Sequence, residues 1–345
     1  MAVLNPRKLP SFDVGPVHVD PGLILAPMSG ITDSPFRRCL KKRNAGAMGL
    51  LVSEFISVEG LTRKNVRSHQ LLRYREDERP ISIQIFGGQI DRMVKAAAIV
   101  QERGADILDI NAGCPVPKVV RKGGGAELMR RCDHLDEMLR RVVAEVDIPV
   151  TLKTRTGWDA SHVNAVEVAQ LAEAAGIKMI AVHGRSRVAA YSGQADWDII
   201  EAVAEAVDLP VLGSGDVVTP QDAEKRLASG KVSGLMIGRG AMKNPWIFRQ
   251  IREHLAGEPL HAPDIDEQLQ FLRDYTQDLW EHLPAKAVPG RVKRIASQFT
   301  KGLPGGAVLR NAIYASQTPQ EVMDVLAGYR PFEFVDVPGA VVEAA

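Results

Sequence analysis

The sequence predicts a closed barrel of eight parallel β-strands wrapped by helices, followed by a small helical domain. Eight short β-rich apolar runs alternate with helical patterns along the first two-thirds of the chain, and after residue 257 only helical patterns remain. A (β/α)8 TIM barrel takes about 250 residues, so a chain of 345 residues leaves room for one appendage. We therefore predict a barrel over residues 1–257 and a helical domain over residues 258–345.

The eight candidate strands are apolar over several consecutive positions. This pattern is typical of parallel strands that are covered on both faces. The runs span residues 23–26, 50–53, 81–86, 107–110, 149–153, 179–183, 210–213 and 235–237.

Helical periodicity fills the stretches between these runs. Apolar residues recur every three or four positions in segments 90–97 and 133–146, and Asp33 and Thr219 have the character of helix N-caps. An open doubly wound sheet would instead carry a G-x-G-x-x-G fingerprint after its first strand. Residues 26–30 read Ala-Pro-Met-Ser-Gly, which lacks that spacing, so we favour the closed barrel.

The last part of the chain shows no further strand signal. A polar, proline-containing connection over 258–264 leads into four helical patterns, at 265–283, 290–301, 306–316 and 319–327. These patterns predict a small, separate helical domain.

Composition is that of an ordinary soluble globular chain, with 45% apolar and 25% charged residues. No apolar run reaches the roughly 18 residues of a membrane helix, and residues 1–10 lack the apolar stretch of a secretory signal. Three cysteines are too few for a disulfide framework, so a reducing cytoplasm is expected. A monomer without membrane contact is also expected. The net charge of +1 neither implies nor excludes a nucleic-acid partner.

Polar residues stand where the candidate strands end. In a barrel of this class the active site forms at the C-terminal ends of the strands. Buried polar groups are costly unless they are used or paired, so their concentration predicts an active site there. The groups are Glu54, Gln84, Asn111, Cys114, Lys153, His183 and the glycine turns 213–216 and 238–240.

The two glycine turns follow the seventh and eighth strands. Barrels commonly bind phosphate at this position, through backbone N–H groups at a helix N-terminus. Arg239 adds a guanidinium to the second turn. The alternative is a pair of tight turns without a ligand.

The remaining groups leave the cofactor open when taken as residues alone. No metal is predicted, because the strand ends offer one histidine and no paired carboxylates. Gln84, Lys153 and a phosphate cradle suit flavin mononucleotide (FMN), with Gln84 bonding the pyrimidine edge of the ring and Lys153 stabilising negative charge there. Lys153 suits a Schiff base equally well.

Cys114 lies in the loop after the fourth strand, within the segment Asn-Ala-Gly-Cys-Pro at 111–115. A thiol with an unperturbed pKa of about 8.5 is mostly protonated at neutral pH. It is therefore a usable proton donor, although a nucleophile or an inert thiol would look the same in the sequence. Cys39 and Cys132 fall in helical patterns and are expected to be structural.

These segments together resemble the tRNA-dihydrouridine synthase family, most closely its bacterial B-type branch. The resemblance rests on ordered motifs over about the first 250 residues. They are Ala-Pro-Met at 26–28, Gln-Ile-Phe-Gly at 84–87, Asn-Ala-Gly-Cys-Pro at 111–115, Lys-Thr-Arg-Thr-Gly-Trp at 153–158, His-Gly-Arg at 183–185, Gly-Arg-Gly at 238–240 and Asn-Pro-Trp-Ile-Phe at 244–248.

The resemblance implies reduction of the C5–C6 bond of specific uridines in tRNA to 5,6-dihydrouridine. NADPH or NADH would reduce FMN, the flavin N5 would give a hydride to C6, and Cys114 would protonate C5. Asn111 would contact the uracil. The matching FMN contacts would be Pro27, Met28, Ser29, Gln84, Lys153, His183, Ser214, Gly215, Asp216, Gly238 and Arg239.

Two features depart from the family pattern. Ser214 stands where asparagine is usual, and segment 293–302 lacks a histidine and a Trp-Tyr pair expected of that branch. Basic residues gather at 286–310 and 37–43 and beside the Cys114 loop, where they would meet RNA phosphates, although such runs are usually solvated faces.

Three other functions stay open beside tRNA uridine reduction. One is an FMN barrel oxidoreductase acting on a free pyrimidine or another small molecule. A second is a Schiff-base lyase that uses Lys153, and a third is a non-catalytic RNA-binding protein. The sequence does not identify the target uridine.

Overall fold

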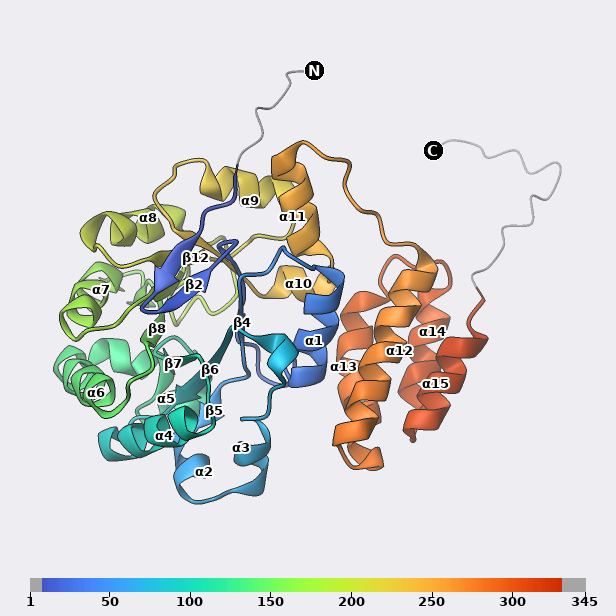
Figure 1. Cartoon of the computed structure of the whole chain (residues 1–345), viewed down its shortest axis with the longest axis horizontal. Helices are drawn as coiled ribbons and strands as arrows, with labels where there is room; N and C mark the ends of the chain where they lie inside the picture. Colours follow the sequence, from blue (N-terminus) through green and yellow to red (C-terminus); the bar gives the residue numbers. More distant parts are fainter. Residues whose placement is uncertain (1–7, 331–345) are drawn as a thin grey trace. The chain divides into compact units, whose positions relative to one another are not determined.

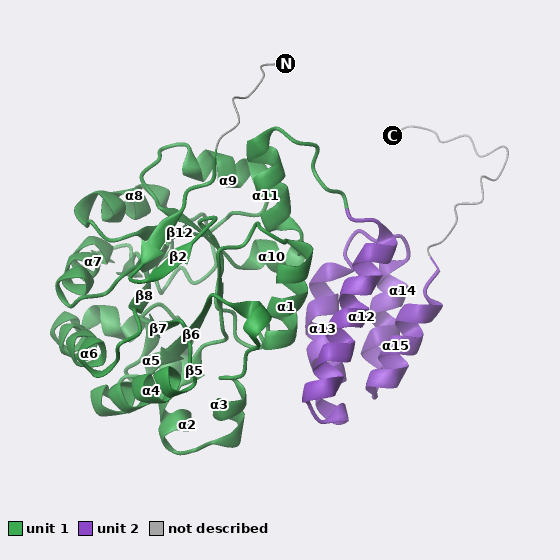
Figure 2. Cartoon of the chain, in the orientation of Figure 1, with its two compact units in different colours: residues 1–262 green, residues 263–345 purple. Residues whose placement is uncertain are grey.

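The computed structural model describes residues 8–330 and divides the chain into two compact units, residues 1–262 and 263–345 (Figure 2). The sequence pattern predicts a boundary after residue 257, whereas the first unit continues to residue 262. Residues 258–262 belong to the first unit because Glu253 holds them: its backbone carbonyl accepts from the Glu258 amide at 2.8 Å, and its carboxylate accepts from the His261 amide at 2.6 Å.

The first unit is a closed barrel of eight parallel strands, as predicted. The ring closes because β4 pairs with both β3 and β6, while β13 pairs with β3 at the other side. In ring order the strands are β3 (Leu23–Leu25), β4 (Leu50–Val52), β6 (Ile81–Phe86), β7 (Ile107–Asn111), β8 (Val150–Arg155), β11 (Ile180–His183), β12 (Val211–Ser214) and β13 (Gly234–Ile237). Each lies within a residue or two of a predicted run.

Helices surround the barrel on the outside (Figure 1). They are α1 (Ser34–Arg43), α4 (Ile90–Glu102), α6 (Cys132–Glu145), α7 (Ala165–Ala174), α8 (Trp197–Ala206), α9 (Pro220–Leu227) and α11 (Ile247–Ala256), with shorter helices α2 (Val58–Thr62), α3 (Val66–Gln70), α5 (Pro117–Val120) and α10 (Arg239–Lys243) in the connections. The expected N-caps are confirmed: Asp33 accepts from the Phe36 amide, and Thr219 forms a capping box with Asp222.

The barrel strands are buried on both faces. All five residues of β7 are buried, and the interior holds apolar side chains such as Ile24, Leu212 and Met236. This double coverage is why the strands appear in the sequence as continuous apolar runs.

Several short strands are absent from the prediction. A hairpin of β1 (Phe12–Val14) and β2 (Val17–Val19) turns at Gly15, whose φ is +58°, and packs Val14 and Val19 into the core cluster. The others are β5 (Ile56–Ser57), β9 (Gly157–Asp159) and β10 (His162–Val163). Two or three residues are too few to show a clear alternation of apolar and polar positions.

The second unit is helical, as its four patterns predict. It contains α12 (Ile265–His282), α13 (Val288–Phe299), α14 (Gly306–Ala315) and α15 (Pro319–Gly328). Phe271 and Phe299 lie at its centre with ring centroids 5.1 Å apart. None of the helices in the described part of the chain has the length and apolar composition needed to cross a bilayer.

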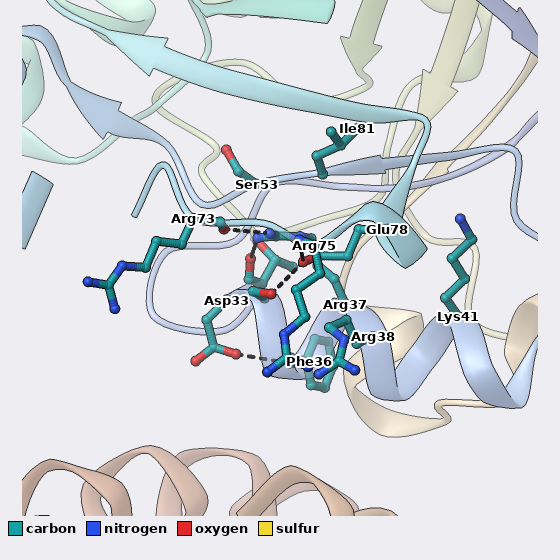
Figure 3. A network of polar contacts seen from close by, with 12 residues as sticks. Asp33, Phe36, Arg37, Arg38, Lys41, Ser53, Arg73, Arg75, Glu78 and Ile81 are labelled. Carbon is teal, nitrogen blue, oxygen red and sulfur yellow. Dashed lines mark hydrogen bonds and ion pairs between the residues drawn. The ribbon is translucent and has the colours of Figure 1, made fainter. Parts of the chain in front are cut away.

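A buried ion pair supports the loop that follows β3 (Figure 3). Arg37 of α1 donates from Nε to Glu78 of the 3-10 turn η1 (Glu76–Glu78) at 2.6 Å, and neither side chain is more than 1% exposed. Arg37 also donates to the carbonyls of Thr32 at 2.7 Å and Arg73 at 3.2 Å. Thr32 in turn accepts from the Met28 amide at 3.0 Å, so the pair fixes the loop that leads to Met28.

The basic run at 37–43 is therefore not wholly available to a partner. Arg37 is buried in its ion pair with Glu78, and Arg38 pairs with Asp77 at 2.9 Å. For Arg37 the expectation of a phosphate-facing residue is wrong, because Glu78 pairs with it inside the fold.

Candidate active site

A cavity of about 360 Å³ opens where the barrel strands end. Cofactor and small-molecule sites commonly range from about 300 to 1,000 Å³. Residues at or just after the ends of β3, β7, β8, β11, β12 and β13 line the cavity. Twelve predicted site residues come together there: Pro27, Met28, Ser29, Asn111, Cys114, Lys153, His183, Ser214, Gly215, Asp216, Gly238 and Arg239.

Glu54 and Gln84 are predicted at the site but do not line the cavity. The Glu54 carboxylate accepts from the Gly30 amide instead. The Gln84 side chain is fully buried, and its amide is engaged by Asp109 at 2.5 Å and Asn111 at 2.8 Å. Its contact with a flavin ring stays a prediction.

Cys114 reaches the cavity from the loop after β7 and is 7% exposed. Asn111 anchors this loop, because its Oδ1 accepts from the backbone amides of Gly113 at 3.1 Å and Cys114 at 2.8 Å. On the other side Gly125, at φ +60°, packs so closely that an added Cβ would lie 2.6 Å from the Cys114 carbonyl oxygen. The loop is therefore held from two directions.

The Cys114 thiol is protonated at neutral pH. Burial raises its pKa above the ordinary value, and a hydrogen bond from the Val116 backbone and the charge of Arg155 only partly oppose this shift. A neutral thiol at the edge of a cavity is a proton donor rather than a thiolate nucleophile.

Lys153 and His183 both line the cavity, the first as a cation and the second as a neutral imidazole. Burial, together with Arg155, lowers the pKa of Lys153 to about 8. Burial and the cations around it lower the pKa of His183 to about 2, so the imidazole is neutral under all physiological conditions. Its Nδ1 is buried and has no hydrogen-bond partner within residues 8–330.

The turns after β12 and β13 bring charged side chains to the cavity. The Asp216 carboxylate accepts from Arg185 and from the Ala195 amide at 2.8 and 2.7 Å, and lies 3.3 Å from Arg239. Although burial acts in the opposite direction, these contacts hold the pKa of Asp216 below its usual range. Asp216 therefore serves to orient Arg185 and Arg239.

Arg155 and Tyr191 are two of the cavity-lining residues that the prediction did not name as site residues. Arg155, next but one to Lys153, donates to the carbonyls of Gly113 at 2.7 Å and Ala190 at 2.9 Å, which ties the Cys114 loop to the loop after β11. Tyr191 lies in that second loop, 59% exposed, with the guanidinium of Arg239 5.2 Å from its ring centroid. Arg155 could have been found from its place in the motif at 153–158, whereas no sequence signal marks Tyr191.

A parallel barrel whose strand ends gather a neutral thiol, an ammonium and an imidazole around one cavity defines a (β/α)8-barrel enzyme. The family model described as "Dihydrouridine synthase (Dus)" matches residues 24–331. The chain belongs to the dihydrouridine synthase family.

Curated relatives point to the same family. The chain is 44% identical to tRNA-dihydrouridine synthase B of Pseudomonas putida, over 76% of this chain and 77% of that protein. It is 46% identical to a probable tRNA-dihydrouridine synthase of Rhodobacter capsulatus, over 78% and 81%. The resemblance to the B-type branch is thus confirmed.

A solved structure shares the barrel fold. A 2-naphthoyl-CoA reductase complex superposes with a TM-score of 0.55 at 16% identity, covering 72% of this chain and 52% of that one. At this identity the similarity concerns the fold alone.

Proposed function

We propose that this protein reduces the C5–C6 bond of uridines in tRNA to 5,6-dihydrouridine, with FMN as resident cofactor and NADPH or NADH as the reductant. One observation carries the proposal: Cys114, Asn111 and Lys153 border a single cavity in a chain of the dihydrouridine synthase family. FMN, when bound, supplies the hydride that adds to C6 of the uracil.

The residues around the cavity fit FMN. Arg239 offers a guanidinium for the phosphate, beside Gly215, where φ is +128° and an added Cβ would lie 2.6 Å from Ala195. The backbone can approach a ligand closely at such a glycine. Lys153 borders the cavity as a cation that suits the electron-rich edge of a flavin, and the unpartnered His183 Nδ1 offers a further hydrogen bond.

Cys114 is the residue that supplies the proton at C5. Its raised pKa keeps the thiol protonated and neutral until the proton is transferred. Addition of a hydride at C6 places negative charge toward C5, so a neutral acid there completes the saturation of the bond. Asn111 orients the same loop and borders the space for the base.

A uridine in folded RNA presents its C5–C6 bond only after it leaves its stack. The substrate is therefore an everted nucleotide whose base enters the cavity while the surrounding RNA meets the surface. We propose that residues 258–345 contribute to tRNA binding, since they hold the basic run at 286–310, and that the protein acts as a cytoplasmic monomer.

The purified protein is expected to be yellow, or to become yellow and retain flavin when incubated with FMN. Loss of dihydrouridine from tRNA of cells lacking this protein, with recovery on re-expression, tests the reaction and identifies the uridine. Product from free uracil, with no salt-dependent tRNA binding, would favour the small-molecule oxidoreductase. Trapping of a substrate on Lys153 by borohydride would favour the lyase, and tRNA binding without dihydrouridine would favour the binding protein.

FMN affinity is expected to decline as pH rises above about 8, because Lys153 loses its charge there. The charged form is the one that binds the flavin edge, and its fraction falls to about one-tenth one unit above the pKa. Flavin fluorescence quenching between pH 6.5 and 9.5 measures this. The Lys153→Met variant should bind FMN more weakly and lack the decline, since the pKa of His183 lies far below this range. An unchanged decline in the variant would assign it to another group.

A further inference from the structure

A chain of polar side chains runs from inside the barrel to the Cys114 loop. Asp109 on β7 lies in register with Gln84 on β6 and Thr151 on β8. Its two carboxylate oxygens accept from Gln84 Nε2 at 2.5 Å and from Thr151 Oγ1 at 2.6 Å. Gln84 Oε1 accepts from Asn111 Nδ2 at 2.8 Å, and Asn111 Oδ1 accepts from the Cys114 amide at 2.8 Å.

The hydrogen-bonding groups at the two ends of this network fix the orientation of the Asn111 and Gln84 amides. Backbone amides can only donate, so the oxygen of Asn111 must face the Cys114 loop and its NH2 must face Gln84. Gln84 must then turn its oxygen to Asn111 and its NH2 to Asp109. Only an acceptor satisfies that NH2 group, and the carboxylate of Asp109 provides it.

Water does not reach the inner part of this hydrogen-bond network, between Gln84 and Asp109. Gln84 is 0% exposed, Asp109 2% and Asn111 6%. A buried amide left without its partner loses a hydrogen bond and gains none from solvent, so the side chains must rearrange instead. A reversed Asn111 would point its NH2 at the Cys114 amide, and the loop would lose its anchor.

We propose that Asp109 is a positioning residue for the proton donor: through Gln84 it holds the Asn111 side chain in the one orientation that anchors the loop carrying Cys114. This role deepens the proposed function and rests on it only for its effect on activity. Barrel interiors are usually filled by branched apolar side chains. The polar set of Gln84, Asp109 and Thr151 stands directly below the layer of Asn111 and Lys153, which are themselves paired in register.

Four variants of the full-length protein separate this role from a general contribution to stability. Asp109→Leu removes the acceptor and keeps the branched shape of the side chain. Asp109→Asn keeps an oxygen for Gln84 and turns its NH2 to the Thr151 hydroxyl, which can also accept. Gln84→Glu sets two carboxyl groups against each other, so the contact survives only where one of them holds a proton. The double variant Gln84→Glu with Asp109→Asn, called the exchange below, gives every donor an acceptor again. In it the carboxylate stands at position 84 in place of position 109.

The rate of alkylation of each cysteine by iodoacetamide, followed by mass spectrometry, gives a readout independent of catalysis. Cys39 is buried in α1, far along the chain from this network, and reports global opening. We expect Asp109→Leu to raise the Cys114 rate by roughly tenfold or more with Cys39 unchanged, since a buried hydrogen-bond chain is broken. Asp109→Asn should stay close to wild type. In Gln84→Glu, the ratio of the Cys114 alkylation rate to that of wild type at the same pH should increase as pH rises. The exchange should bring this ratio back toward one.

The positioning role remains testable even if Asp109→Leu does not fold. The Gln84→Glu variant and the exchange replace only an NH2 group by oxygen or the reverse, so they preserve side-chain size. Equal increases at Cys39 and Cys114, or no restoration by the exchange, would overturn the positioning role. In single turnovers with tRNA, Asp109→Leu should slow uridine reduction by roughly tenfold or more while reduction of the flavin by NADPH is kept. If the alkylation pattern holds but wild type forms no dihydrouridine, the proposed function fails and the positioning role stands.

Discussion

Replacing Cys114 with alanine is expected to remove most uridine reduction while leaving reduction of the flavin by NADPH intact. In the proposed reaction the thiol is the proton donor: it borders the cavity from the loop after β7, and burial raises its pKa. Loss of a general acid typically costs about 10²- to 10⁴-fold in rate. Water entering the space of the thiol would supply the residual protonation.

Stopped-flow kinetics can separate the two half-reactions of this variant. The first follows bleaching of flavin absorbance by NADPH, and the second follows its return on addition of tRNA, with dihydrouridine quantified in the product. Cys132→Ala is the matched control, because Cys132 begins α6 and does not line the cavity. Wild-type product rates in Cys114→Ala would show that another group protonates C5.

Replacing Arg37 with methionine is expected to lower the free energy of unfolding by about 3–5 kcal/mol, the range found when one partner of a buried ion pair is removed. Glu78 would lose its ion-pair partner at a place without access to solvent, since its side chain is 0% exposed. The Thr32 and Arg73 carbonyls would also lose their donor. FMN binding should weaken as well, because Thr32 supports Met28 at the cavity.

Urea unfolding followed by circular dichroism tests this expectation. Arg63→Met is the matched control: Arg63 pairs with Glu59 at 2.7 Å, but its side chain is 66% exposed. Such a surface pair contributes only about 0–1 kcal/mol. Adding Glu78→Gln to Arg37→Met should recover part of the lost free energy of unfolding, because a neutral amide replaces the carboxyl group that lost its cation. If Arg37→Met destabilises no more than Arg63→Met, the buried pair does not stabilise the fold as described.

The barrel could be predicted because its strands carry a strong local signal. All eight ring strands are short apolar runs, and residues such as Lys153 and His183 close those runs at the same end. Chain order alone then brings these residues to one face of a parallel barrel. The hairpin at residues 12–19 and the exposed Tyr191 had no comparable signal, since neither lies in a run long enough to show a period.

The chemical groups near the strand ends, and the order in which they meet around the cavity, follow from local sequence patterns. The partners of these groups depend instead on the three-dimensional packing. Arg37 belongs to a basic run in the sequence, yet it is buried against Glu78, 41 residues away. Gln84 is predicted at a strand end as a ligand residue, yet it lies inside β6, with its amide between Asp109 and Asn111. The physical reason is that strand position follows from local apolar patterning, whereas pairing and burial depend on which distant segments pack together.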